Sequence, residues 1–213
     1  MQSIWSDQIV KPNEVILVQD GDLTNVLNGL IQKWKEKIGN DLKIIFIKKN
    51  AGLAKALNVG LEYCGGDYIA RMDTDDISMP NRFKNQIEFM KNNKIDMCGS
   101  NALLINDLNE EVGVKFVKKF ITFNSLIKSC DIIHPSIMVK KDFFKNYGYY
   151  NIKYIKSQDY ELWLRAAKAG AIITNINDKL IKLRVSGNLI HRRKEEQKYN
   201  INIKKKYLHG MSF

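Results

Sequence analysis

Cysteine, proline and histidine are scarce in this chain of 213 residues, with three of each. The three cysteines are widely separated, so they form neither a disulfide framework nor the paired spacing of a zinc site, and we expect reduced, mostly buried thiols in a cytoplasmic protein. No apolar run is long enough to span a bilayer, and the N-terminus has no signal-peptide pattern. Internal repeats and low-complexity segments are also absent, which excludes solenoid and fibrous classes.

Acidic residues are fewer than basic ones: the sequence has 23 Asp and Glu and 34 Lys and Arg, which gives a net charge of +11. Such an excess indicates an anionic partner, namely a nucleotide, an acidic membrane surface or nucleic acid, although a solubilising lysine-rich surface explains it equally well. The chain has no recognisable nucleic-acid motif, so we expect no nucleic-acid partner. Hydrophobic residues make up 45% of the sequence, enough for a real core, and the length fits one domain or one domain with a small appendage.

Strand and helix patterns alternate through the first half of the chain. Buried strands are predicted at 15–18, 44–47 and 68–72, and two helices separate them. The first of these helices has an apolar face that we expect to point inward: Leu23, Val26, Leu27, Leu30, Ile31, Trp34 and Ile38. The second follows the turn Asn50-Ala-Gly52, and a third begins near Pro80. This order predicts a parallel sheet with helices on its faces.

The second half has a mixed pattern. A strand is predicted at 96–105, followed by a charged turn at 106–111. Helices are then expected at 123–130, 142–147 and 159–169, and short strands at 136–139, 171–176 and 180–185. The basic end of the chain, from residue 192 on, also has a helical composition.

Three carboxylates lie within four residues after the third strand, at Asp73, Asp75 and Asp76. Carboxylates that are gathered together repel one another unless a cation offsets the cost, and ligands of open α/β sheets bind beyond the carboxyl ends of strands. A hard divalent ion completed by substrate phosphates fits this position, whereas a solvated acidic loop is the plainer interpretation. A calcium loop is excluded, because Ser78 and Lys84 stand where that motif needs glycine and glutamate.

Four blocks, in order, resemble the inverting glycosyltransferases of family 2. The segments 18–22, 50–60 and 73–76 resemble that family's first acidic block, its Asn-x-Gly helix start and its DXD metal motif, with Pro80 and Arg82 behind the last. Segment 158–165 resembles the family's "ED" block at the acceptor site, and His134-Pro-Ser resembles an element of bacterial members. The resemblance implies an α/β fold of the GT-A (Rossmann-like) type, a three-layer sandwich around a mostly parallel sheet. It places a nucleotide-sugar half at about 1–105, an acceptor half at about 106–185 and a basic tail at 186–213.

The resemblance also assigns residues to the donor side of a metal-dependent transferase. It implies Mn²⁺ or Mg²⁺ on Asp75 and Asp76, which would stabilise a nucleoside-diphosphate leaving group. The nucleotide-sugar would be contacted by a further set: Asp20, Asn50, Gly52, Lys55, Asp73 and Asp75. Alternatives remain open here, since Asp20 could simply form the turn before Gly21, and Lys55 could be an exposed helix lysine. Backbone N–H groups near Gly52 could also bind phosphate.

On the acceptor side the resemblance makes Asp159 the catalytic base, although an Asp there would also serve as a helix N-cap. Gln158 replaces the family's usual acidic residue beside that base, and Trp163 is expected in the core with neighbours facing the acceptor. His134 could contact acceptor or phosphate, or be structural. Arg184-Val-Ser186 resembles a late Tyr-Arg-x-His element in which the histidine is missing, and His191 is a candidate substitute.

The largest departure from the family is at the front of the sequence. Members begin with a central strand and a full helix, whereas this sequence has only a helix tail over residues 1–7. We therefore expect an open slot in the sheet, with backbone groups left without partners.

The sequence predicts an inverting transferase of bacterial surface polysaccharide or lipopolysaccharide assembly, cytoplasmic or peripheral at the inner face of the plasma membrane. Its acceptor would be a glycan or lipid-linked glycan, and the basic tail could contact anionic lipid. The alternative is an inactive remnant or one half of a split enzyme.

Overall fold

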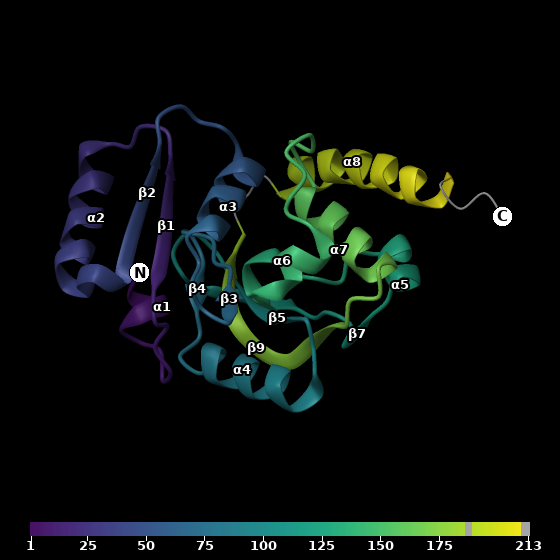
Figure 1. Ribbon diagram of the computed structural model, residues 1–213, viewed down its shortest axis with the longest axis horizontal. Coiled ribbons are helices and arrows are strands. Elements are labelled where there is room, and N and C mark those ends of the chain that lie inside the picture. Colours follow the sequence, from purple (N-terminus) through teal and green to yellow (C-terminus); the bar gives the residue numbers. More distant parts are fainter. Residues whose placement is uncertain (186–188, 210–213) are drawn as a thin grey trace.

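The computed structural model describes residues 1–185 and 189–209, although not the side chains of 189–196 and 209. Figure 1 shows helices on both sides of a central sheet, with a smaller strand pair at one end. The elements of the first half are α1 (Gln2–Trp5), β1 (Val15–Asp20), α2 (Asn25–Ile38), β2 (Leu42–Ile47), α3 (Leu53–Glu62), β3 (Tyr68–Ala70), β4 (Ile77–Ser78) and α4 (Arg82–Asn93). Those of the second half are β5 (Met97–Ile105), β6 (Glu111–Lys115), β7 (Phe120–Ile121), α5 (Phe123–Lys128), β8 (Met138–Lys140), α6 (Asp142–Tyr147), α7 (Gln158–Lys168), β9 (Ile173–Arg184) and α8 (Leu189–His209).

The strands form two sheets instead of one. β1 and β2 pair in parallel as a two-stranded sheet, and the remaining strands form a seven-stranded sheet with the order β3-β8-β5-β9-β4, to which β6 and β7 add. Among the strand pairs of the described residues, only β1–β2 and β5–β9 are parallel, so the fold is α/β but its sheet is mixed. The slot that the sequence predicts corresponds to this break between β1 and β3.

The main core lies between the seven-stranded sheet and the helices α3, α5, α6 and α7. Trp163 and Leu162 of α7 are fully buried there, as their spacing predicts. A second cluster on the other face joins α4 to the sheet through Phe83 and Met90. Figure 1 shows α4 beneath β9 and α7 above it. The three cysteines are free, but only Cys98 is buried, whereas Cys64 and Cys130 are partly buried, so the expected burial is found at one of the three. Burial raises the pKa of Cys98 to about 12.

The predicted inward face of α2 is wrong. Val26, Leu27 and Leu30 are 74%, 46% and 47% exposed, and Ile38 is the one residue of this helix that is buried. The helix is attached at its C-terminal end, where Lys35 Nζ donates to the Leu42 carbonyl at 2.7 Å. The periodicity was interpreted correctly as a helix, but a two-stranded sheet is too narrow to cover its apolar stripe.

Three further features of the secondary structure differ from the sequence prediction. The segments 171–176 and 180–185 form one strand, β9, whose register against β5 shifts near Asn101. Strand β6 was not predicted, because it is an exposed hairpin arm whose side chains face solvent. Pro80 precedes α4 instead of lying within it, since the helix begins at Arg82 after Asn81.

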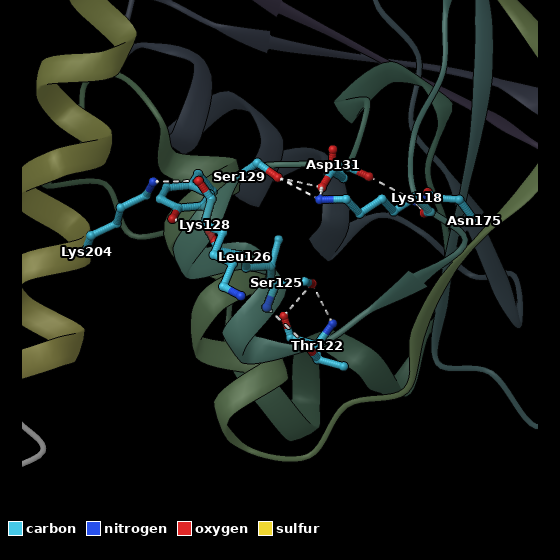
Figure 2. Close-up of polar contacts among 10 residues, drawn as sticks. Lys118, Thr122, Ser125, Leu126, Lys128, Ser129, Asp131, Asn175 and Lys204 are labelled. Atoms are coloured by element: carbon cyan, nitrogen blue, oxygen red, sulfur yellow. Dashed lines mark hydrogen bonds and ion pairs between the residues drawn. The ribbon is translucent and has the colours of Figure 1, made fainter.

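The basic end of the chain is helical, as expected, and it packs on the domain. Ile203 of α8 is buried in the main core, and the Tyr207 hydroxyl donates to Glu161 Oε1 at 2.8 Å. Figure 2 shows Lys204 beside the end of α5, where its Nζ donates to the Lys128 carbonyl at 3.3 Å. The same view shows the capping box of α5, in which Thr122 and Ser125 satisfy each other's backbone N–H groups. No helix within the described residues is both long and apolar enough to cross a membrane.

Candidate active site

The acidic loop, residues Asp73–Asp76, lies between the short strands β3 and β4. One carboxylate oxygen from each of Asp73, Asp75 and Asp76 can be chosen so that all three lie within 4.8 Å of one another. The three differ in environment, because Asp76 is buried, Asp73 is partly buried and Asp75 is exposed. The loop therefore gathers hard oxygen ligands of the kind that Mg²⁺ and Mn²⁺ prefer.

Asp73 already has a cationic partner. The Arg71 guanidinium, two residues upstream, donates from Nη1 and Nη2 to the two carboxylate oxygens of Asp73, the Nη1 bond measuring 2.6 Å. Arg71 is itself largely buried, with a side-chain exposure of 9%. A two-pronged pair of this kind fixes the carboxylate's orientation, which leaves Asp75 and Asp76 as the carboxylates more open to a metal.

Asp76 is held from the opposite side by β9. Its Oδ1 accepts a hydrogen bond from the Arg184 backbone N–H at 2.7 Å. The pKa of Asp76 is raised to about 6, mainly by burial and also by the neighbouring charges of Asp73 and Asp75, whereas the Arg184 bond and Arg71 oppose the rise. A buried carboxylate that resists ionisation alone gains most from a cation.

The Arg184 side chain connects the loop to the β5–β6 hairpin. Its Nε donates to the Asp75 carbonyl at 2.9 Å, and its Nη1 and Nη2 donate to Asn106 and Asn109 at 2.5 Å each. The sequence singled out Arg184 by resemblance but did not predict these partners. Ser186 lies outside the described residues and the side chain of His191 is not described, so the predicted substitution of that histidine stays a prediction.

A second buried arginine supports the loop from below. Arg82 is fully buried, and its Nη2 donates to the carbonyls of Arg71 and Ile137 at 2.8 and 3.1 Å. Burial lowers the pKa of Arg82 to about 10, which leaves it a cation at neutral pH. It therefore holds the end of β3 against β8 and places a positive charge near the carboxylates.

Asp159 lies in the first turn of α7, and its side chain is 26% exposed. Its Oδ2 is 3.8 Å from Nδ1 of His134, whose Nε2 is 2.9 Å from the Tyr150 hydroxyl. Burial, together with the charge of Arg71, lowers the pKa of His134 well below its ordinary value, so the imidazole is neutral. The N-cap of α7 is Ser157, so the alternative of Asp159 as a cap is wrong.

Tyr150 connects the two halves of the site. Burial raises its pKa, Arg71 lowers it, and the charges of Asp159 and Asp73 both raise it. Its hydroxyl lies 2.9 Å from His134 Nε2, and the segment that begins at His134 accepts a hydrogen bond from the Arg71 N–H at the Ile137 carbonyl, at 3.1 Å. Sequence reasoning missed Tyr150 and Arg71, and the only available signal for Arg71 was its two-residue spacing from Asp73.

The remaining acceptor-side residues lie in α7, next to Asp159 or against His134. Gln158 is 5% exposed, and Trp163 is fully buried with its ring 5.9 Å from that of His134 in an edge-on arrangement. Trp163 therefore belongs to the core, as expected, and Gln158 has little surface to offer an acceptor.

The residues predicted to bind the nucleotide form a separate group at the end of β1. Asp20 accepts hydrogen bonds from the backbone N–H groups of Ala51 and Gly52 at 2.7 and 3.0 Å, and Asn50 Nδ2 donates to the Asp20 carbonyl at 3.3 Å. The structure thus joins the first two sequence blocks. It also shows that the Gly52 N–H, suggested as a phosphate donor, is already engaged by Asp20. Lys55 is exposed one turn further along α3.

These features define an α/β protein with clustered carboxylates at the end of a strand and a separate carboxylate at a helix start. Residues 6–148 match the model of Glycosyl transferase family 2. Over 192 residues the chain is 32% identical to the amylovoran biosynthesis glycosyltransferase AmsE of Erwinia amylovora, with 88% of this chain and 70% of the relative covered. It is 33% identical to a UDP-Gal:alpha-D-GlcNAc-diphosphoundecaprenol beta-1,3-galactosyltransferase of Escherichia coli, with 91% and 70% covered. The chain belongs to glycosyl transferase family 2.

A solved structure shares the fold. S. aureus TarS 1-349 in complex with UDP superimposes with a TM-score of 0.69 at 19% identity, over 88% of this chain. The match spans 56% of that solved chain. The α/β fold of the GT-A type expected from the sequence is therefore confirmed, although its sheet is mixed and not mostly parallel.

Proposed function

We propose that this protein transfers a sugar from a nucleoside-diphosphate sugar to an acceptor hydroxyl with inversion, and that Asp159 is the base. The observation that carries the proposal is that His134 lies 3.8 Å from Asp159 and that its segment is joined to the strand before the acidic loop, where the Arg71 N–H donates to the Ile137 carbonyl at 3.1 Å. A donor diphosphate at the acidic loop and an acceptor hydroxyl at Asp159 would then be brought together by this segment. Asp159 takes the hydroxyl proton, the acceptor oxygen bonds to the anomeric carbon, and the bond from that carbon to the diphosphate oxygen breaks.

On the donor side we assign Mn²⁺ or Mg²⁺ to Asp75 and Asp76. The assignment rests on three gathered carboxylate oxygens and on the pairing of Arg71 with the Asp73 carboxylate. When bound, such an ion neutralises charge that develops on the departing diphosphate. Asp73 is then positioned for the sugar or ribose, and the loop of Asp20, Asn50 and Gly52, with Lys55 behind it, for the nucleotide.

For the substrates we propose a UDP-hexose and a lipid-linked, GlcNAc-terminated diphosphate, in bacterial surface polysaccharide assembly. One relative uses UDP-galactose and a GlcNAc-diphosphoundecaprenol acceptor, and TarS was crystallised with UDP. His134 is neutral, so it can contact the Asp159 carboxylate without adding a positive charge. Such a charge would weaken the carboxylate as a base.

Calorimetric titration tests the donor side. UDP, GDP and dTDP are each titrated into the protein with and without Mn²⁺, and we expect UDP to bind in a metal-dependent manner that Asp75→Ala abolishes. Asp107→Ala, in an exposed turn outside the acidic loop, is the matched control. Binding of no nucleotide by folded protein, or metal-independent binding that survives Asp75→Ala, contradicts the proposal.

Transfer to a GlcNAc-diphospholipid tests the base. Asp159→Asn should lower kcat by about 10²–10⁴-fold, the usual range for a general base, while UDP affinity stays within about twofold. An Asp159→Asn variant that retains full activity would remove this residue from the mechanism.

We also propose that α8 contacts an anionic membrane surface. Ile201, Leu208 and Lys205 are exposed at helical spacing, so one side of the helix offers apolar and cationic groups together. Flotation with liposomes containing about 30% anionic lipid tests this. Equal recovery with neutral and anionic liposomes would contradict the membrane contact without affecting the transferase proposal.

A further inference from the structure

Three polar groups form a chain of contacts next to the start of α7: the Tyr150 hydroxyl, the His134 imidazole and the Asp159 carboxylate. The hydroxyl oxygen is 2.9 Å from Nε2 of His134, and Nδ1 of the same ring is 3.8 Å from Oδ2 of Asp159. One imidazole therefore lies between a phenol and a carboxylate, with one ring nitrogen near each. The nitrogen that carries the hydrogen decides what the carboxylate faces.

The His134 ring is held in place by aromatic neighbours. Its side chain is 10% exposed, and the ring centroids of Trp163 and Tyr150 are 5.9 and 5.6 Å away. Tyr150 is itself buried, and its ring lies near those of Phe144 and Trp163. Because close packing on several sides restricts rotation, the two nitrogens of His134 keep their separate partners.

The His134 ring carries a single N–H. Burial and the positive charge of Arg71 lower the pKa of His134 well below its ordinary value, so the imidazole is neutral. A neutral imidazole has two tautomers, with the hydrogen on either Nδ1 or Nε2, and the hydrogen bond that one nitrogen makes determines which of them is populated. The partner of Nε2 is a hydroxyl, which can donate or accept.

The surroundings of the Tyr150 hydroxyl favour one of these tautomers. Burial raises the pKa of Tyr150, so the phenol keeps its proton. Within the part of the chain that the structure describes, this hydroxyl has one hydrogen-bond partner, the His134 ring. With the hydrogen on Nε2, the phenol proton would lack an acceptor and a bare Nδ1 would face the Asp159 carboxylate. With the hydrogen on Nδ1, neither cost arises.

We infer that Tyr150 is a positioning residue: its hydroxyl donates to Nε2 of His134 and thereby keeps the hydrogen on Nδ1, on the side of Asp159. A separation of 3.8 Å is long for a hydrogen bond, and contacts between catalytic groups often shorten when substrate binds. The Nδ1–H dipole favours the ionised carboxylate and orients it toward the ring. The tautomer follows from the contacts, whereas its effect on transfer rests on the proposed function of Asp159.

Nitrogen-15 NMR of histidine-labelled protein tests the tautomer without measuring activity, because a protonated and a bare ring nitrogen have different chemical shifts. The sequence has three histidines, and His134→Gln identifies the signals of His134. In the unsubstituted protein we expect the Nδ1–H form to exceed the Nε2–H form by at least about tenfold.

Two further variants separate the effect of Tyr150 from that of Asp159. Asp159→Ala should keep the Nδ1–H preference, because Tyr150 still donates to Nε2, whereas Tyr150→Phe added to Asp159→Ala should abolish it. A bare Nδ1 in the unsubstituted protein would overturn the proposal. Loss of the preference in Asp159→Ala alone would overturn it as well, because Asp159 would then set the tautomer.

Steady-state transfer kinetics test the positioning role. Tyr150→Phe should lower kcat by about tenfold or more, while KM for the UDP-hexose stays within about twofold, because the donor side is not altered. Tyr147→Phe is the matched control: it removes a hydroxyl that lies 3.4 Å from Asp96 and should leave both the tautomer and kcat unchanged. Full kcat in Tyr150→Phe would contradict the positioning role.

Replacements of His134 give the same decision without changing Tyr150. The asparagine amide N–H can occupy the place of Nδ1–H, whereas glutamine brings its amide near the place of Nε2, so His134→Asn should retain more kcat than His134→Gln. Tyr150→Phe added to His134→Asn should then have no further effect, and additive losses would contradict the proposal. Absence of transfer by the unsubstituted protein would instead contradict the proposed function, and the NMR result would still decide the tautomer.

Discussion

The side-chain amide of Asn58 pairs with both backbone polar groups of Tyr150. Asn58 Nδ2 donates to the Tyr150 carbonyl at 2.8 Å, and the Tyr150 N–H donates to Asn58 Oδ1 at 3.0 Å. The two hydrogen bonds resemble those between residues of paired strands, and they join α3 to the segment before α7. It fixes the residue whose hydroxyl reaches His134.

Replacing Asn58 by alanine should destabilise the protein by about 1–3 kcal/mol, because two partly buried backbone groups lose their partner. Transfer activity should fall as well, since Tyr150 is released. Urea unfolding measures the first effect, and Asn93→Ala, which removes an exposed contact within α4, is the control and should stay within about 0.5 kcal/mol. Equal losses in the two variants would show that the Asn58 pair is not special.

Stability should depend on the protonation of Asp76. Its pKa in the folded protein is about 6, above the value of about 4 for an unfolded chain. The folded state then binds more protons between these values, so this group's contribution is full below about pH 4 and is lost as pH rises through about 6. The Asp76→Asn variant has no carboxyl group to titrate, so its stability does not fall in this way. In EDTA, the free energy of unfolding of the variant minus that of wild type should therefore increase by about 1–2 kcal/mol between pH 4.5 and pH 7.5.

The same titration should govern metal binding. Below about pH 6 a proton competes for Asp76, so Mn²⁺ affinity should fall as pH decreases, and more steeply in wild type than in Asp76→Asn. A stability difference between the two proteins that does not change with pH would contradict the assigned pKa.

Arg184 should tune the acidic loop without contacting the metal. Removing its side chain frees the Asp75 carbonyl and releases the loop from Asn106 and Asn109. Outer-shell partners of this kind are typically worth 10–100-fold in metal affinity, so Arg184→Ala should weaken Mn²⁺-dependent UDP binding by about tenfold. Lys182→Ala, on the same strand, removes only a surface ion pair with Glu111 and is the control. Unchanged UDP affinity in Arg184→Ala would limit this arginine to a structural role.

The stabilising contribution of Glu14 should be lost in acid. Burial alone would raise its pKa, but the Lys43 ammonium and the N–H groups of Gly65 and Gly66 outweigh it and lower the pKa. A lowered pKa means that its contribution is present above the unfolded value of about 4.3 and is lost as pH falls through the folded value. Glu14→Gln should therefore be less stable than wild type at pH 7, with the difference shrinking toward pH 3. Thermal unfolding at both pH values measures this, and a constant difference would contradict it.

Local patterns predicted the helices of the second half well. The helix 142–147 matches α6, and α7 begins one residue before its predicted start, because apolar periodicity and turn residues mark both. The gathering of the three carboxylates of the acidic loop was also predicted from sequence, whereas the role of Asp159 stays a prediction. Contacts between distant segments were not, since nothing local indicates that Arg184 reaches Asp75 or that Asn58 reaches Tyr150. The predicted inward face of α2 is wrong for the same reason, because periodicity indicates an apolar stripe but not which element covers it.

Helix α3 connects the two substrate sides as a single rigid piece. Its N-terminal loop is clamped by Asp20 at Gly52, and six residues later Asn58 is clamped to Tyr150. At 1.5 Å per residue these clamps are about 9 Å apart along one helix. In the proposed reaction, a nucleotide that moved the Asp20 loop would act through this helix on Tyr150, the partner of His134. Donor and acceptor binding would then be coupled through α3.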